Sequence, residues 1–78
     1  MKIGDMLTEA QLAALAKQYR MAAGKTRSEA AREMGVKHPS IFHAEETLEQ
    51  SLLKLRKRMI EKYSPYRVGG PGYWLEKK

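Results

Sequence analysis

Signals for helix starts and stops divide this chain into short segments, and they constrain its fold more than any other feature. Thr8 and Gln11 stand three residues apart ahead of an apolar run. Thr26 and Glu29 repeat the same spacing. In such a capping box the threonine oxygen accepts the third residue's N–H, and that residue's side chain accepts the threonine N–H. The chain is therefore expected to be mainly α, with helices that begin after both threonines.

Apolar spacing and glycines set the extent of these two helices. Residues three and four apart share one face of a helix. On the first helix the inward residues are expected to be Leu12, Leu15, Tyr19 and Ala22. On the second they are expected to be Ala30, Ala31 and Met34. Gly24 and Gly35 should end the two helices, because glycine readily adopts the left-handed backbone at a helix stop.

Two more helices are expected before residue 64. The third should begin near His38 and Pro39, since proline is tolerated in the first turn, and should run to about Glu45. The fourth should open at a capping box made by Thr47 and Gln50. It should end at residues 64–65, because the residue before a proline resists helical dihedral angles. Its inward stripe is expected to be Leu48, Leu52, Leu55, Met59 and Tyr63, with Leu53 and Ile60 off the stripe.

The last 15 residues change character. Strand-forming residues at 66–68 and 73–75 flank a turn rich in glycine at 69–72, which predicts a β-hairpin. An isolated two-stranded hairpin is unstable in water, so this one must pack on something. We expect one domain over residues 1–78, a four- to five-helix bundle at 8–63 with a C-terminal β-hairpin at 64–78.

Composition narrows the choice of partners. Fifteen Lys and Arg against nine Asp and Glu give a net charge of +6. This surplus favours a polyanion, nucleic acid first and an anionic membrane surface second, although a merely soluble surface explains it too. There is no cysteine, which fits a reducing compartment and excludes a disulfide or thiolate site. Because no signal peptide or membrane-spanning run is found, we expect a cytoplasmic protein without cofactor or membrane partner.

The second and third helices carry the requirements of a helix-turn-helix. The small Ala31 stands where two helices would touch most closely. Gly35 supplies the positive φ of the turn, and Ile41 would anchor the later helix in the core. Outward positions between these anchors are largely polar, as contact with DNA requires.

Residues 26–36, together with Ser40, Ile41 and Glu45, resemble the Cro/C1-type (XRE) helix-turn-helix family, and the resemblance covers about residues 10–60. It implies a lambda-repressor-like fold and a transcriptional regulator of phage or mobile-element type. Such a protein would bind a double-stranded DNA operator as a homodimer and repress its own operon. The resemblance also implies an ion pair between Arg20 and Glu45 that joins the first and third helices.

The resemblance assigns roles to individual residues. The recognition helix would span residues 37–44, with base contacts from His38, Pro39, Ser40, Phe42 and His43. Phosphate contacts would come from Thr26, Arg27, Lys37 and Arg56. The sequence departs from the family pattern at Arg27, where glutamine is usual, and at Ala30, where leucine is usual. An arginine at position 27 favours a phosphate contact over a base contact.

Other interpretations of the same residues stay open. His38 and His43 are five residues apart, so they do not share a helix face as two metal-binding histidines four residues apart would. Both could be ordinary surface histidines. Ser40 lacks an orienting acid, so we expect neither catalysis nor a metal site. The basic run at 54–58 is either a DNA clamp or the solvated face of its helix, and the same basic surface could bind RNA.

The aromatic tail leaves two structural alternatives. A dimer interface would be formed by Leu53, Ile60, Tyr66, Val68, Tyr73 and Trp74. Alternatively, the hairpin folds back onto its own helices and completes a monomer. A third interpretation is an antitoxin-type module whose tail or fourth helix holds a toxin or another protein.

Overall fold

The computed structural model describes residues 6–50, 52–70 and 72–78. Over these residues the chain forms four helices followed by two antiparallel strands. They are α1 (Glu9–Ala22), α2 (Arg27–Met34), α3 (His38–Glu46), α4 (Leu53–Tyr63), β1 (Tyr66–Gly69) and β2 (Trp74–Lys77). Residues 1–5, Ser51 and Pro71 lie outside the described residues. The signal-peptide prediction concerns residues 1–5, and the predicted hairpin turn includes Pro71.

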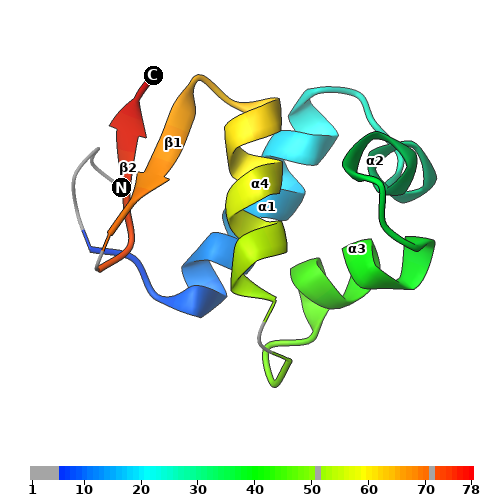
Figure 1. Cartoon of the computed structure of the whole chain (residues 1–78), viewed down its shortest axis with the longest axis horizontal. Helices are drawn as coiled ribbons and strands as arrows, with labels where there is room; N and C mark the ends of the chain where they lie inside the picture. The colour runs from blue at the N-terminus through cyan, green and yellow to red at the C-terminus, as the bar shows by residue number, and fades with distance from the viewer. Residues whose placement is uncertain (1–5, 51, 71) are drawn as a thin grey trace.

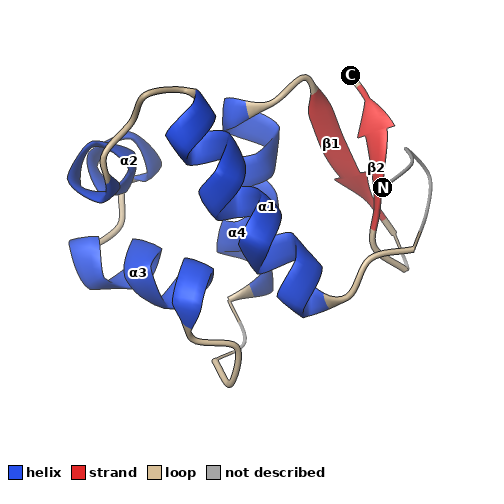
Figure 2. Cartoon of the chain, turned by 180° about the vertical axis from the view of Figure 1, so that it is seen from behind, coloured by secondary structure: helices blue, strands red, loops and turns tan. Residues whose placement is uncertain are grey.

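The helices α1 and α4 pack against each other in the middle of the molecule. The α2–α3 pair covers one side and the hairpin covers the other (Figures 1 and 2). The largest fully buried apolar side chains of the core come from these central helices and from α3: Leu12, Ile41, Met59 and Ile60. The expected mainly helical fold with a C-terminal hairpin is therefore confirmed.

Both predicted capping boxes are present. The Thr8 hydroxyl accepts the Gln11 N–H at 3.1 Å, and the Gln11 side chain accepts the Thr8 N–H at 2.8 Å. Thr26 and Glu29 exchange the same two bonds at 3.1 and 2.9 Å. Each box satisfies backbone donors that a helix start would otherwise leave free. The prediction of two helix starts from short-range spacing is confirmed.

The predicted inward face of α1 is only partly right. Leu12 and Leu15 are buried and Tyr19 is half-buried, but Ala22 is exposed. Ala22 lies in the last turn of the helix, where the chain is exposed from residue 21 to residue 24. Gly24 and Gly35 have φ of +73° and +70°, as expected of glycines that follow a helix.

The predicted start of the fourth helix is wrong. Thr47 ends α3: its N–H donates to the His43 carbonyl at 3.0 Å. Its hydroxyl lies 2.9 Å from Nδ1 of His43, and its carbonyl accepts a bond from Arg56 at 3.0 Å. Thr47 is thus engaged with α3 and α4, and α4 starts at Leu53.

The inward stripe of α4 also differs from the prediction. Leu48 precedes the helix and is 51% exposed, whereas Ile60 is completely buried. Tyr63, at the end of the helix, is half-buried and donates to Glu33 at 2.6 Å. The buried face of α4 is wider than the predicted stripe, because Arg56 and Ile60 lie in the core beside Leu55 and Met59. The predicted end is confirmed, since Ser64 before Pro65 has an extended backbone.

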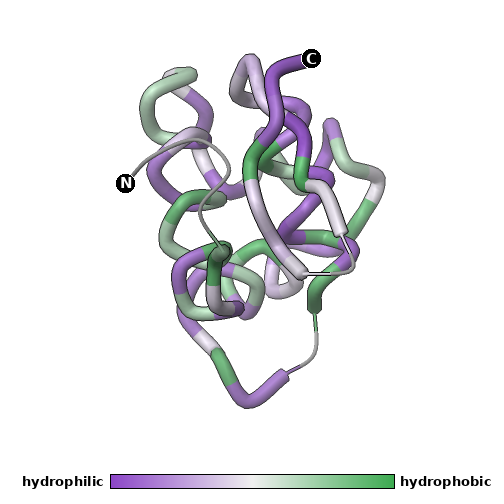
Figure 3. Tube along the Cα trace, turned by 90° about the vertical axis from the view of Figure 1, so that its left-hand side faces the viewer, coloured by the Kyte–Doolittle hydropathy of each residue, from purple (hydrophilic) through white to green (hydrophobic). Residues whose placement is uncertain are grey.

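The hairpin packs on its own chain. Val68 and Leu75 face each other across the two strands, and both are buried in the core. The Leu7 N–H donates to the Tyr73 carbonyl at 2.5 Å, and the Val68 N–H donates to Glu61 of α4 at 3.2 Å. Seen from the hairpin end, the turn is pale and the C-terminal end is hydrophilic (Figure 3).

This packing corrects the predicted dimer interface. Ile60 and Val68 cannot meet a second chain, because both are buried within their own chain. Leu53, Tyr66, Tyr73 and Trp74 are half-buried and keep part of their surface accessible. The hairpin thus folds onto its own helices, and a dimer through the half-buried residues stays a prediction.

No helix among residues 6–50, 52–70 and 72–78 has the length and apolar character that a membrane crossing needs.

Candidate nucleic-acid interface

Two short helices, α2 and α3, are joined by a turn at residues 35–37. Gly35 adopts the left-handed backbone and its N–H donates to the Arg32 carbonyl at 3.3 Å. The Val36 N–H donates to the Ala31 carbonyl at 3.0 Å. Ala31 and Ile41 are buried, as the sequence predicts for the contact and the anchor of this unit. The turn therefore fixes the direction in which α3 leaves α2.

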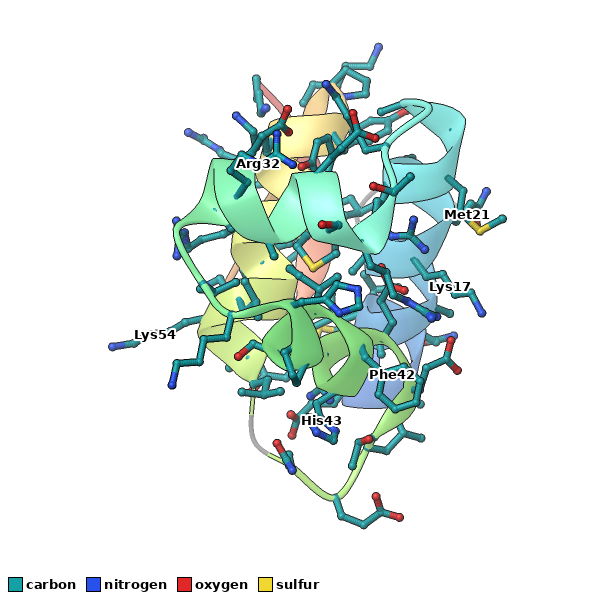
Figure 4. The ribbon with its side chains drawn as sticks, turned by 90° about the vertical axis from the view of Figure 1, so that its right-hand side faces the viewer. Lys17, Met21, Arg32, Phe42, His43 and Lys54 are labelled. Atoms are coloured by element: carbon teal, nitrogen blue, oxygen red, sulfur yellow. The ribbon has the colours of Figure 1, made fainter. Side chains whose placement is uncertain are left out.

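The outer side of α3 carries the residues predicted to contact bases. His38, Pro39 and Phe42 are exposed, and Ser40 and His43 are half-buried. Lys37, which precedes the helix, is exposed as well. Figure 4 looks onto this side of the molecule, with Phe42 and His43 on the α3 ribbon. All five side chains thus retain accessible surface on one helix.

Phe42 and His43 have ordered surroundings. The guanidinium carbon of Arg27 lies 5.1 Å from the centroid of the Phe42 ring, and the His43 ring meets Phe42 edge-on at 5.6 Å. Nδ1 of His43 lies 2.9 Å from the Thr47 hydroxyl. That contact engages Nδ1, and the other ring nitrogen of His43, which has no hydrogen-bond partner among the described residues, is the one that can meet a ligand.

The predicted ion pair between Arg20 and Glu45 is confirmed. Arg20 donates to both Glu45 oxygens, from Nε at 2.5 Å and from Nη2 at 3.1 Å. Its Nη1 donates to the Lys25 carbonyl at 2.7 Å. The Glu45 side chain is completely buried, so the pair is desolvated and its geometry ties α1 to α3.

Arg27 does not reach out as a free phosphate ligand. Its Nε donates to Glu45 at 3.0 Å, and its Nη2 donates to Glu46 at 2.9 Å. These two bonds give Arg27 a structural role that joins the start of α2 to the end of α3. Its side chain is 29% exposed, and the phosphate contact stays a prediction.

Glu46 connects the same unit to α1. It accepts from Lys17 at 2.7 Å in addition to Arg27. The hydrogen bond from Lys17 is the main reason that the pKa of Glu46 lies below its ordinary value. We call Lys17, Arg20, Arg27, Glu45 and Glu46 the charge network, and it links α1, α2 and α3.

The prediction that Arg56 contacts phosphate is wrong. Its side chain is 0% exposed, and its guanidinium is used internally. Nε donates to the Ala44 carbonyl at 2.8 Å, Nη2 to the Thr47 carbonyl at 3.0 Å, and Nη1 to Glu9 at 3.3 Å. Arg56 thus satisfies carbonyls at the C-terminal end of α3, which a helix leaves without internal partners.

The remaining predicted phosphate contacts differ in availability. The Thr26 N–H and hydroxyl oxygen both serve the capping box, while the residue itself is exposed. The bond from the Thr26 N–H is the main reason that the pKa of Glu29 is lowered. Lys37 is exposed and has no carboxylate partner within the described residues.

Sequence reasoning missed Arg32 as a candidate phosphate contact and considered Lys54 only as part of the basic run at 54–58. Arg32 on α2 and Lys54 on α4 are exposed, and in the part of the chain that the structure describes neither pairs with a carboxylate. Figure 4 shows both on one side of the view, opposite Lys17 and Met21. Arg32 lies inside the motif at residues 26–36, so its outward position between Ala31 and Met34 was the available signal.

Over residues 6–50, 52–70 and 72–78, no group of three His, Asp or Glu side chains lies close enough together to hold a metal ion.

Comparison with family models, with curated proteins and with solved structures gave no match for this chain.

Proposed function

We propose that this chain is a transcriptional regulator that binds duplex DNA by inserting α3 into the major groove. The observation that carries the proposal is the outer side of α3, which is exposed on a helix held in direction by the turn at 35–37 and by the charge network. A major groove admits one α-helix, and each base pair offers a distinct pattern of donors and acceptors there. The sequence resemblance to Cro/C1-type regulators supports the same function.

The side chains on α3 suit base contact. His43 keeps one ring nitrogen free of the Thr47 hydroxyl and can donate to guanine N7 or O6 when that nitrogen is protonated. Ser40 can donate or accept, and the exposed edge of Phe42 can meet a thymine methyl group. We propose His43 as the principal specificity residue, because its ring is oriented by Thr47 and Phe42 before DNA arrives.

The proposed phosphate contacts come from cations that are not occupied internally. Lys37, Arg32 and Lys54 are exposed around α3, whereas Arg27 and Arg56 are committed to partners in the protein. Each lysine or arginine that meets a phosphate releases condensed counterions and adds to the salt dependence of binding. The net charge of +6 acts in the same direction.

Two-fold symmetry is part of the proposal. A homodimer would set two copies of α3 in successive major grooves about 34 Å apart and would select a pseudo-palindromic site. Repression of its own operon would follow from a site that overlaps the promoter. Among the residues predicted for an interface, only the half-buried ones, such as Leu53 and Trp74, keep accessible surface for this role.

Selection of bound duplexes from a random pool tests the proposal. A recurrent site is expected, and mirror symmetry within it would support the dimer. Failure to enrich any duplex, or tighter binding to single-stranded RNA of matched length at the same salt concentration, would reject the proposed function.

Two variants then test the residue roles on the selected site. His43→Ala should weaken specific binding by about 1–3 kcal/mol and leave non-specific binding unchanged. Lys37→Gln should weaken binding to all sequences and reduce the salt slope by about one. Lys62 is an exposed lysine in the last turn of α4, and Lys62→Gln is the matched control. It should change neither the affinity for DNA nor the salt slope.

A further inference from the structure

A groove lies beside α3, between the α2–α3 turn and the first half of α4. Its volume is about 590 Å³, within the range of small-molecule sites in proteins. The groove is lined by Val36, Ser40, Leu52, Leu53, Lys54, Leu55 and Arg58. It is a separate feature from the exposed side of α3, although Ser40 belongs to both.

The lining has a definite chemistry. Apolar side chains from the turn and from α4 make up most of it, and its polar members are one hydroxyl and two cations. Among the residues that the structure describes, no acidic side chain lines the groove. An apolar surface with positive charges and no negative one complements an anion that carries a hydrocarbon part.

The two cations are placed differently. Arg58 donates from Nη2 to the Met34 carbonyl at 2.8 Å, which fixes the guanidinium at the end of α2 and leaves its other N–H groups for a ligand. Lys54 is exposed, and within the described residues it has no carboxylate partner. One cation that is hydrogen-bonded to the protein and one exposed cation thus border the same apolar groove.

We propose that this groove binds a small apolar carboxylate, of the size of a medium-chain fatty acid. The carboxylate would accept charge-assisted hydrogen bonds from Arg58 and Lys54, and the chain would lie against Leu52 and Leu53. Burial of the chain supplies affinity in proportion to the apolar area removed from water. The cations select an acid over an alcohol or an amine of equal length.

Occupancy of the groove bears on α3. Val36 lies in the turn that directs α3, and Ser40 lies on α3 itself. A ligand that contacts both residues would change the affinity for DNA, and DNA would change the affinity for the ligand by the same factor. This consequence rests on the proposed function, whereas binding of the carboxylate does not.

Titration with octanoate, followed by backbone amide shifts, tests the proposal directly. Saturable shifts are expected at residues 36, 40 and 52–58, and octan-1-ol and octylammonium should produce much smaller ones. Lys54→Gln should weaken octanoate binding about tenfold, because a charge-assisted hydrogen bond is lost. The control Lys62→Gln should leave it unchanged. Equal binding of the alcohol, or an unaffected Lys54→Gln variant, would overturn the proposal.

Two further measurements separate the ligand site from its alternatives. Sedimentation at the protein concentration of the titration tests whether the groove is sealed between two copies. If the protein is a dimer and the amides of residues 36, 40 and 52–58 do not shift with octanoate, the groove is an interface between two copies and the proposal is overturned. DNA binding measured with and without octanoate tests the coupling alone. Octanoate binding in a protein that binds no DNA would support the site while rejecting the proposed function.

Discussion

The two ends of the molecule are held together by different forces. At the α2–α3 end, three positively charged side chains surround the carboxylates of Glu45 and Glu46, and Glu45 is completely buried. At the hairpin end, Val68 and Leu75 pack into the core with Ile60. The first end depends on directional hydrogen bonds, and the second depends mainly on apolar burial.

Side-chain size explains the difference. The buried residues of α2 and α3 include Ala30, Ala31 and Ala44, which bury little apolar area each. The charge network adds directional hydrogen bonds between α1, α2 and α3 to the apolar contacts of Met34 and Ile41. The hairpin has one ion pair among its described residues, Arg67 with Glu76, and that pair lies at the surface. The end that carries the exposed side of α3 is thus the one held by directional hydrogen bonds.

Removal of the buried carboxylate should have the largest effect. Glu45→Ala leaves Arg20 buried without its partner and should lower the free energy of unfolding by about 3–5 kcal/mol. Urea unfolding at pH 7 measures the loss. Glu49→Ala, which removes an exposed glutamate, is the control and should stay within about 0.5 kcal/mol of wild type. A Glu45→Ala loss as small as the control would mean that the network does not position α3.

A core truncation at the hairpin end should come next. Leu75→Ala removes a buried side chain and should cost about 2–4 kcal/mol, with Leu48→Ala as the exposed control. Hydrogen exchange under native conditions sharpens the comparison. In the Leu75→Ala variant, amides of β1 should lose more protection than those of α3. In the Glu45→Ala variant, amides of α3 should lose more protection than those of β1. Equal loss at both ends in both variants would show that the two ends unfold as one unit.

Loss of the α2 cap should have a smaller effect. Thr26→Ala removes the hydroxyl that accepts the Glu29 N–H and should cost about 1 kcal/mol. Ser28→Ala, at an exposed position in the first turn of the same helix, is the matched control. Thermal unfolding measures both variants. A neutral Thr26→Ala would indicate that tertiary contacts alone hold the start of α2.

Acid should weaken the helical end more than the hairpin end. Hydrogen bonds from Thr26, Tyr63 and Lys17 are the main reasons that the pKa values of Glu29, Glu33 and Glu46 are lowered. A lowered pKa means that the unfolded chain binds more protons, so the stabilisation is present above pH 4.5 and is lost as the pH falls through the folded values.

In the hairpin, the carboxylate with a lowered pKa is that of Glu76, and the hydrogen bond from Trp74 is the main cause. Urea unfolding between pH 7 and pH 3 should therefore show a decline below pH 4.5 that Glu46→Gln and Glu33→Gln each make shallower. Because these groups are exposed, each change should be the smallest of the effects predicted here. A decline that is unchanged in both variants would assign acid sensitivity to other groups.

Local features of the fold could be predicted because their partners are three or four residues apart. The bonds between Thr8 and Gln11 form as soon as the helix turns, and Gly35 takes a conformation that its lack of a Cβ permits. The ion pair of Arg20 with Glu45 spans 25 residues, and only the family resemblance gave access to it.

The sequence alone determined the helix starts at Thr8 and Thr26, the turn at Gly35 and the end of α4 before Pro65. Backbone donors and dihedral preferences impose these features within one turn of chain.

Only the tertiary structure decided the start of α4, the burial of Arg56 and the engagement of Arg27. The partners of Arg56 lie as far as 47 residues away, at Glu9, and those of Arg27 lie 18 and 19 residues away. A pattern of helix propensity contains no information on such partners. An arginine is equally able to meet a phosphate or a carboxylate, and the packing of distant helices selects between them.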